Sequence, residues 1–150
     1  MIWVIGLDVT LKLVKNIITI DGPSGVGKGT LAFTLAESLG WNVLDSGLLY
    51  RLVGYLSLEE KLESLSEIVL FLNKSKIKLL TNLKDSICEI ELNERIVGKE
   101  LRNEDIALRA SELAKEEEIR NAIITIQRNA YDAEKLSLIH ISEPTRLGAI

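Results

Sequence analysis

One short stretch of the sequence has residue types and spacing suited to binding phosphate. Residues 20–32 read IDGPSGVGKGTLA and fit the pattern G-x-x-x-x-G-K at Gly22, Gly27 and Lys28, with Gly25 inside it. Polyphosphate binds where successive backbone N–H groups converge, and residues without a Cβ let the chain wrap that closely and take positive φ. The Lys28 ammonium can then reach the phosphates. The stretch predicts a phosphate-binding loop; the alternative is a glycine-rich turn with a surface lysine.

One position departs from the usual form of this pattern. The residue after Lys28 is Gly29, where the general motif has the serine or threonine that holds magnesium. Thr30 follows one place later. We therefore assign Thr30 to phosphate, or to magnesium through a water molecule, and we name no direct protein ligand for the metal.

The segments on either side of the loop are those that such a loop needs. Residues 16–20, NIITI, are apolar on both faces, as in a strand buried in a parallel sheet. From Lys28 to Leu39 the apolar residues recur at helical spacing, and Gly40 is a typical left-handed stop. The expected order is strand, loop and helix, so the free N–H groups of the helix point toward the bound anion.

The next part of the chain mixes helical and strand patterns. Residues 41–44 predict a second short strand, and residues 48–56 predict a helix that Asp45 or Ser46 could cap. Residues 56–75 keep helical spacing with charges on the opposite side, which predicts one amphipathic helix.

The second half of the chain begins with strand-like pieces. The three pieces that predict a small antiparallel sheet between helices are residues 76–81, 86–92 and 95–98. A last helical region is expected from Asn103 to about Lys135. Its acidic run, residues 116–118, indicates either a solvated helix face or a turn between two helices.

Composition and charge exclude several classes of protein. With 150 residues, 47% of them apolar and 27% charged, the chain is expected to form a soluble globular protein. A net charge of −4 argues against binding to duplex nucleic acid. The chain has no run of about 18 uninterrupted apolar residues, so we expect no membrane-spanning helix. The lone cysteine, Cys88, can form no internal disulfide, which suits a reducing compartment.

Two stretches of the sequence, ITIDGPSGVGKGTLAFTLAESLGW and VLDSGLLYR, together resemble the cytidylate kinase family of nucleoside monophosphate kinases. The G-K-G-T ending alone would also suit adenylate kinases, whereas the following L-D-S-G-x-x-Y-R pattern is narrower. The resemblance covers residues 17–132. It implies an α/β fold with a P-loop and a doubly wound parallel sheet, incomplete here. A small antiparallel sheet and helices would form the inserted monophosphate-binding region.

The resemblance also implies an activity. Members of this family transfer the γ-phosphoryl group of ATP to CMP or dCMP, giving CDP or dCDP and ADP, with Mg²⁺ as the cofactor of ATP. Two alternatives stay open: another nucleoside monophosphate kinase acting on AMP or UMP, and a truncated nucleotide-binding fragment without turnover. The expected partners are ATP and CMP or dCMP, with neither nucleic acid nor a membrane. We expect a cytoplasmic monomer.

Matched motifs transfer the family's site residues to this sequence. Lys28 would be catalytic and stabilise the transferring group. Those that would hold the ATP phosphates are Gly22, Pro23, Ser24, Gly25, Val26, Gly27, Lys28, Gly29 and Thr30. Those that would bind CMP are Ser46, Arg51, Arg102, Ser111 and Arg120. Ser46 and Arg51 would hold the CMP phosphate, and Ser111 and Arg120 the cytosine edge; the alternative for Arg51 is a helix-surface arginine.

The two ends of the chain fit the resemblance less well. The expected divisions are an unexplained extension (1–16), the start of the P-loop core (17–60), the monophosphate-binding region (61–120), a helix returning to the core (121–135) and a non-native tail (136–150). After Asp132 the family would continue into an Asp-Gly-Arg-Asp motif and an arginine-rich lid, which this sequence lacks. Residues 136–146, LSLIHISEPTR, instead resemble a translated sequencing adapter, so we assign His140 no role. Without later strands, the strand at residues 17–20 is expected to have two unpaired edges.

Overall fold

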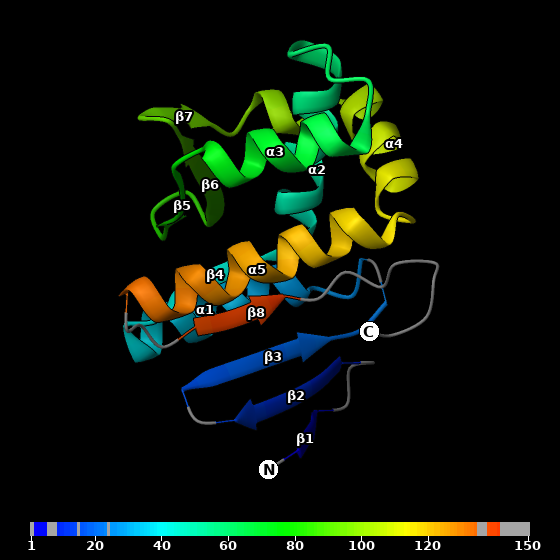
Figure 1. The fold of residues 1–150 in the computed structure, drawn as a ribbon. Helices are drawn as coiled ribbons and strands as arrows, with labels where there is room; N and C mark the ends of the chain where they lie inside the picture. The colour runs from blue at the N-terminus through cyan, green and yellow to red at the C-terminus, as the bar shows by residue number, and fades with distance from the viewer. Residues whose placement is uncertain (1, 6–8, 15, 24, 135–137, 142–150) are drawn as a thin grey trace. The chain divides into compact units, whose positions relative to one another are not determined.

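The strand that precedes the glycine loop is the middle strand of a mixed five-stranded sheet (Figure 1). The computed structural model describes residues 2–5, 9–14, 16–23, 25–134 and 138–141. The sheet, in spatial order, consists of β1 (Ile2–Ile5), β2 (Val9–Val14), β3 (Ile17–Asp21), β8 (Leu138–Ile141) and β4 (Asn42–Asp45). β3, β8 and β4 run parallel, while β2 is antiparallel to both of its neighbours.

The expectation that β3 has two unpaired edges is wrong. On one side β3 pairs with β2, with Ile20 opposite Leu11, and on the other it pairs with β8, with Ile20 opposite Ile141. The extension before residue 17, which was unexplained from the sequence, supplies β1 and β2. A short connection lets β2 fold back on β3, and unpaired backbone groups at a strand edge favour any β-forming segment within reach. Of the adapter-like residues 136–146, residues 138–141 form β8, and the others lie outside the described residues.

The helix after the loop packs against this sheet through small side chains. α1 (Lys28–Leu39) ends where predicted, because Gly40 adopts the left-handed conformation with φ of 67° and caps the helix. Ala32 and Ala36 are completely buried in a cluster with Ile20 of β3. The alanines allow the helix to approach the sheet closely, which fixes the position of the loop between the two elements.

The single amphipathic helix predicted for residues 56–75 is two helices. α2 (Ser46–Glu59) ends first, and α3 (Leu65–Lys74) begins after Ser64. Ser64 and Glu67 form a capping box: the Ser64 hydroxyl accepts from the Glu67 N–H, and the Glu67 carboxylate accepts from the Ser64 N–H. This box gives the sequence a local helix start that interrupts the continuous apolar spacing.

The predicted small antiparallel sheet is present. Its strands are β5 (Ile77–Asn82), β6 (Ile87–Leu92) and β7 (Arg95–Val97), in that spatial order. β6 and β7 are antiparallel, with Ile90 opposite Val97. Both of these side chains are buried.

The last helical region is also divided. The short 3-10 helix η1 (Glu100–Arg102) comes first, and α4 (Glu104–Leu113) follows it. Asn103 is the N-terminal cap of α4, and its side chain accepts from the Asp105 N–H. α5 (Glu117–Glu134) follows after a short turn. Of the two alternatives for the acidic run, the turn between helices is therefore confirmed. The glutamates in the first turn of α5 lie at the positive end of its dipole.

The chain divides into two compact units. Unit 1 comprises Met1–Ser46, Leu80–Cys88 and Tyr131–Ile150, and unit 2 comprises Gly47–Leu79 and Glu89–Ala130. The glycine loop belongs to unit 1. Among the described residues, no helix has the length and apolar character needed to cross a membrane.

Candidate functional site

The glycine loop owes its shape to two left-handed residues. Gly25 has φ of 80° and Gly27 has φ of 91°, and Gly27 is also the N-terminal cap of α1. A Cβ built at either position meets no atom within 4 Å. Glycine is therefore required here by backbone conformation rather than by lack of space, because other L residues are strained at such φ values.

Lys28 folds back over the loop. Its side chain is 5% exposed, and its Nζ donates to the carbonyl oxygens of Gly22, at 2.5 Å, and Pro23, at 3.2 Å. A buried ammonium is costly unless it has such acceptors. The alternative of a surface lysine is therefore wrong. The ammonium is held beside the N-terminal end of α1, where an anion would be stabilised by the charge of Lys28 and by the positive end of the helix dipole.

The remaining loop residues differ in what the structure shows. Val26 is half-buried against the cluster around Ile20, so it anchors the loop to the sheet. Gly29 and Thr30 are exposed in the first turn of α1 and are open to a ligand. Ser24 lies outside the described residues.

A hollow of about 300 Å³ adjoins the first turns of α1 in unit 1. Gly29 and Thr30 are among its lining residues, and Phe33 and Leu83 contribute apolar surface. The last two residues of the predicted phosphate-binding stretch, Gly29 and Thr30, therefore line a concave surface that also carries an aromatic side chain.

In unit 2, Arg51 and the segment before α4 are brought together. Arg51 lies on α2 and is half-buried, and its Nη1 donates to the carbonyl oxygen of Leu101 at 3.4 Å. Arg102 follows directly in η1 and is exposed. Arg51 is thus more constrained than an arginine on a helix surface. Ser46, the first residue of α2, belongs to unit 1 and is partly exposed.

Arg120 closes the turn between α4 and α5. Its Nη1 donates to the carbonyl oxygens of Ala114, at 3.2 Å, and Lys115, at 2.5 Å. The Arg120 guanidinium also acts on Tyr50, the residue before Arg51. Burial raises the pKa of the Tyr50 hydroxyl, and the positive charge of Arg120 opposes that rise. Ser111 is exposed on α4. The five predicted acceptor residues therefore come from α2, η1, α4 and α5.

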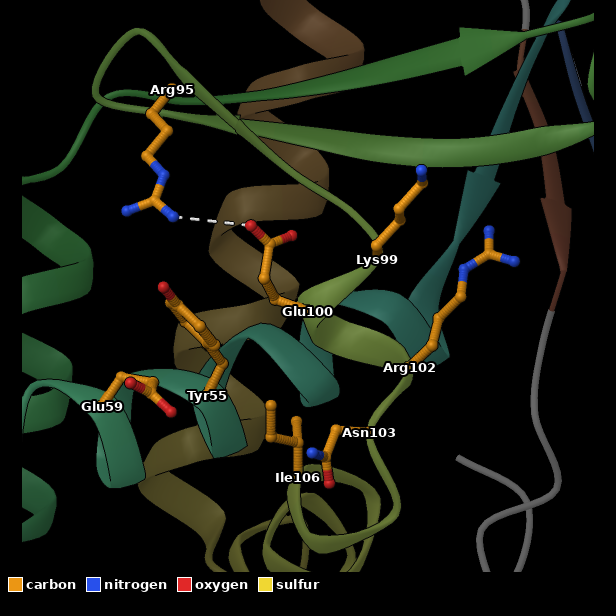
Figure 2. Close-up of a pocket in the computed structure, with 8 residues that line it drawn as sticks. All are labelled: Tyr55, Glu59, Arg95, Lys99, Glu100, Arg102, Asn103 and Ile106. Atoms are coloured by element: carbon orange, nitrogen blue, oxygen red, sulfur yellow. Dashed lines mark hydrogen bonds and ion pairs between the residues drawn. The ribbon is translucent and has the colours of Figure 1, made fainter.

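A pocket of about 560 Å³ lies beside η1, in unit 2 (Figure 2). Its lining residues are Tyr55, Glu59, Arg95, Lys99, Glu100, Arg102, Asn103 and Ile106. Arg95 and Glu100 form an ion pair at 3.5 Å, drawn as the dashed line in Figure 2. Hydrogen bonds from its own N–H and that of Gly98 hold the pKa of Glu100 below its usual value, with a smaller contribution from Arg95.

Of the residues lining this pocket, sequence reasoning singled out Arg102 alone. Arg95 and Lys99 were missed as companions of Arg102, although the basic spacing in RIVGKELR was a signal for them. No group of three or more histidine, cysteine, aspartate or glutamate side chains suited to a metal ion occurs in the part of the chain that the structure describes.

A strand, a glycine loop and a helix within a mixed α/β fold, together with a small antiparallel sheet, are consistent with a nucleotide kinase. The family model for cytidylate kinase matches residues 18–139. The chain therefore belongs to the cytidylate kinase family.

Curated relatives support the same family. A cytidylate kinase of Pasteurella multocida is 38% identical over 115 residues, which are 77% of this chain and 51% of the relative. The cytidylate kinase of Photobacterium profundum is 37% identical over 75% of this chain and 49% of the relative. That of Serratia proteamaculans is 37% identical over 80% of this chain and 52% of the relative. The chain spans about half the length of the curated relatives it matches.

Proposed function

We propose that this chain acts in the transfer of the γ-phosphoryl group of ATP to CMP or dCMP, giving CDP or dCDP and ADP. The observation that carries the proposal is the buried ammonium of Lys28, held over a glycine loop at the N-terminal end of α1. Phosphoryl transfer depends on positioning and on neutralising charge, and these groups supply both. Family membership points to CMP as the acceptor.

On the donor side, residues 22–30 would wrap the ATP phosphates. The left-handed conformations of Gly25 and Gly27 are of the kind that lets backbone N–H groups converge on an anion, and Lys28 would exchange its two carbonyl partners for phosphate oxygens. Mg²⁺ bound with ATP supplies further neutralisation of phosphate charge. Thr30 offers an exposed hydroxyl oxygen, a donor type that suits a metal carried by the nucleotide.

On the acceptor side, Ser46 and Arg51 would bind the CMP phosphate, and Arg102 would add positive charge beside Arg51. The hydrogen bond from Arg51 to the Leu101 carbonyl supports this grouping, because it joins α2 to the residue before Arg102. Ser111 and Arg120 would contact the cytosine edge. Arginine suits the phosphate role because its planar guanidinium can bind two oxygens at once.

Further parts of the proposal follow from family membership. The sheet would be the core of a doubly wound P-loop fold, with residues 61–120 as the monophosphate-binding region, in a cytoplasmic monomer. A second candidate function is nucleotide binding without turnover.

A comparison of acceptors tests the proposal. Purified chain is incubated with ATP and Mg²⁺ and with CMP, dCMP, UMP or AMP at one concentration, while ADP formation and nucleotide binding are measured. Formation of ADP that is fastest with CMP or dCMP supports the kinase. Binding of ATP and CMP without ADP formation supports the second candidate. Better turnover with AMP or UMP would contradict the proposed acceptor.

A further inference from the structure

Gly54 lies in the middle of α2, where helix propensity alone disfavours glycine. Relative to alanine, glycine inside a helix is unfavourable because it gives the unfolded chain more conformational freedom. A Cβ built on Gly54 would lie 2.6 Å from the carbonyl oxygen of Ile106 and 2.9 Å from the backbone nitrogen of Ala110. Both atoms belong to the backbone of α4, so no side-chain rotation relieves the overlap. Gly54 therefore allows the backbones of α2 and α4 to touch.

Two polar contacts flank this close approach on the same side of α2. Three residues before Gly54, Arg51 donates to the carbonyl oxygen of Leu101 at 3.4 Å. Three residues after it, the buried Ser57 hydroxyl accepts from Nε of Arg109 at 3.0 Å. Residues three apart lie on neighbouring parts of a helix surface. The contacts therefore form one line along α2 that holds η1 and α4.

The atoms that meet this line are next to residues that we assign to the acceptor site. Leu101 precedes Arg102, and Ala110, whose nitrogen limits the space at Gly54, precedes Ser111. The distance between the α2 and α4 backbones therefore sets how far Arg51 lies from Arg102 and Ser111. A side chain at position 54 would separate the helices and move these groups apart.

We propose that Gly54 is a positioning residue for the acceptor site: the α2–α4 contact at Gly54 sets the spacing of Arg51, Arg102 and Ser111 for CMP. This inference rests on the proposed function. It assigns Gly54 no contact with substrate. Misplacement by about 1 Å of the groups that position a substrate can reduce the reaction rate about a hundredfold, so a single methyl group is a sufficient perturbation.

The test compares G54A with G98A in the full chain. Gly98 is a matched control because it is also buried in unit 2, while a Cβ there meets only the flexible Glu89 side chain, at 3.4 Å. Dissociation constants for CMP and for ATP are measured by calorimetry well below the unfolding temperature. We expect G54A to weaken CMP binding by about tenfold or more and to leave ATP binding within about twofold. We expect G98A to change neither.

Each other outcome has a distinct meaning. A folded G54A chain that binds CMP as tightly as the unmodified chain would overturn the inference and leave the proposed function intact. Equal weakening of CMP and ATP would also overturn it, because that result indicates general destabilisation. An unmodified chain that binds no CMP would overturn the proposed function, and the inference with it.

A second variant keeps the test decisive if G54A does not fold. S57A removes the hydroxyl that Arg109 contacts and introduces no overlap. We expect S57A to weaken CMP binding by about threefold with unchanged ATP binding, because loss of the Arg109 hydrogen bond loosens the contact between α2 and α4. Unchanged CMP binding by S57A would overturn the inference.

Discussion

The hydroxyl of Thr81 bonds to both backbone polar groups of Val43. It accepts from the Val43 N–H at 2.9 Å and donates to the Val43 carbonyl oxygen at 3.3 Å. Val43 lies in β4, the last strand in the order of its sheet. The Thr81 side chain thus supplies hydrogen bonds that a further strand would otherwise supply to the edge strand. Such bonds matter because unpaired backbone groups at a sheet edge favour pairing with other chains.

Replacing Thr81 with valine tests this edge contact. T81V keeps the shape of the side chain but removes the acceptor of the Val43 N–H, whereas the Val43 carbonyl oxygen still accepts from Cys88 Sγ at 3.5 Å. Because Val43 is buried, we expect a loss of about 1–3 kcal/mol in the free energy of unfolding. Urea unfolding measures the change. The matched control is T125V, where the hydroxyl is exposed and bonds only within its own helix to Asn121. Equal effects of T81V and T125V would show that the edge contact adds no stability.

Lys28 provides a test of the donor site. In K28M the loop loses the ammonium, and we expect ATP binding to weaken about 10- to 100-fold, the equivalent of a charge-assisted hydrogen bond. Titration calorimetry with ATP and Mg²⁺ measures the affinity. K84M, at an exposed lysine of unit 1, is the control and should bind ATP normally. Normal ATP binding by K28M would remove Lys28 from the donor site.

Arg51 provides the corresponding test of the acceptor site. R51K keeps the charge but loses the planar pair of N–H donors, so we expect CMP binding to weaken by about tenfold while ATP binding is unchanged. R128K, at an exposed arginine of α5, serves as the control. If R51K and R128K bind CMP equally well, Arg51 does not hold the acceptor phosphate.

The capping box at Ser64 has a measurable pH dependence. The backbone N–H and then the hydroxyl of Ser64 lower the pKa of the Glu67 carboxyl in the folded chain. A lowered folded-state pKa contributes stability that is present above the unfolded-state pKa and is lost as pH falls through the folded-state value. Urea unfolding at a series of acid pH values should show this loss, and E67Q should reduce it. An E67Q chain with the same acid profile would contradict the assignment.

Removing the cap itself should act at all pH values. S64A eliminates the acceptor for the Glu67 N–H, and we expect it to lower the free energy of unfolding by about 1 kcal/mol. S38A is the control, because the exposed Ser38 hydroxyl only donates to Thr34 within α1. The result would count against the capping role if S64A and S38A had equal stability.

Much of the fold could be predicted from local patterns. The glycine loop, the stop of α1 at Gly40 and the small antiparallel sheet are where the sequence places them. The break between α2 and α3 was missed, although Ser64 and Glu67 are a readable helix start, because apolar spacing continues across it. The predicted site residues stay predictions, but the structure explains why some are constrained, Arg51 above all.

The sequence by itself determined the features that depend on neighbours in the chain. Turn residues, helix caps and apolar periodicity act within a few positions, so Gly27 and Lys28 could be assigned to a phosphate loop directly. Tertiary structure alone decided the burial of Lys28, the two partners of β3, and the α2–α4 contact at Gly54. Thr81 reaches Val43 across 38 positions. Such contacts depend on how the elements pack in space, and the spacing of residues along the chain does not show which distant residues meet.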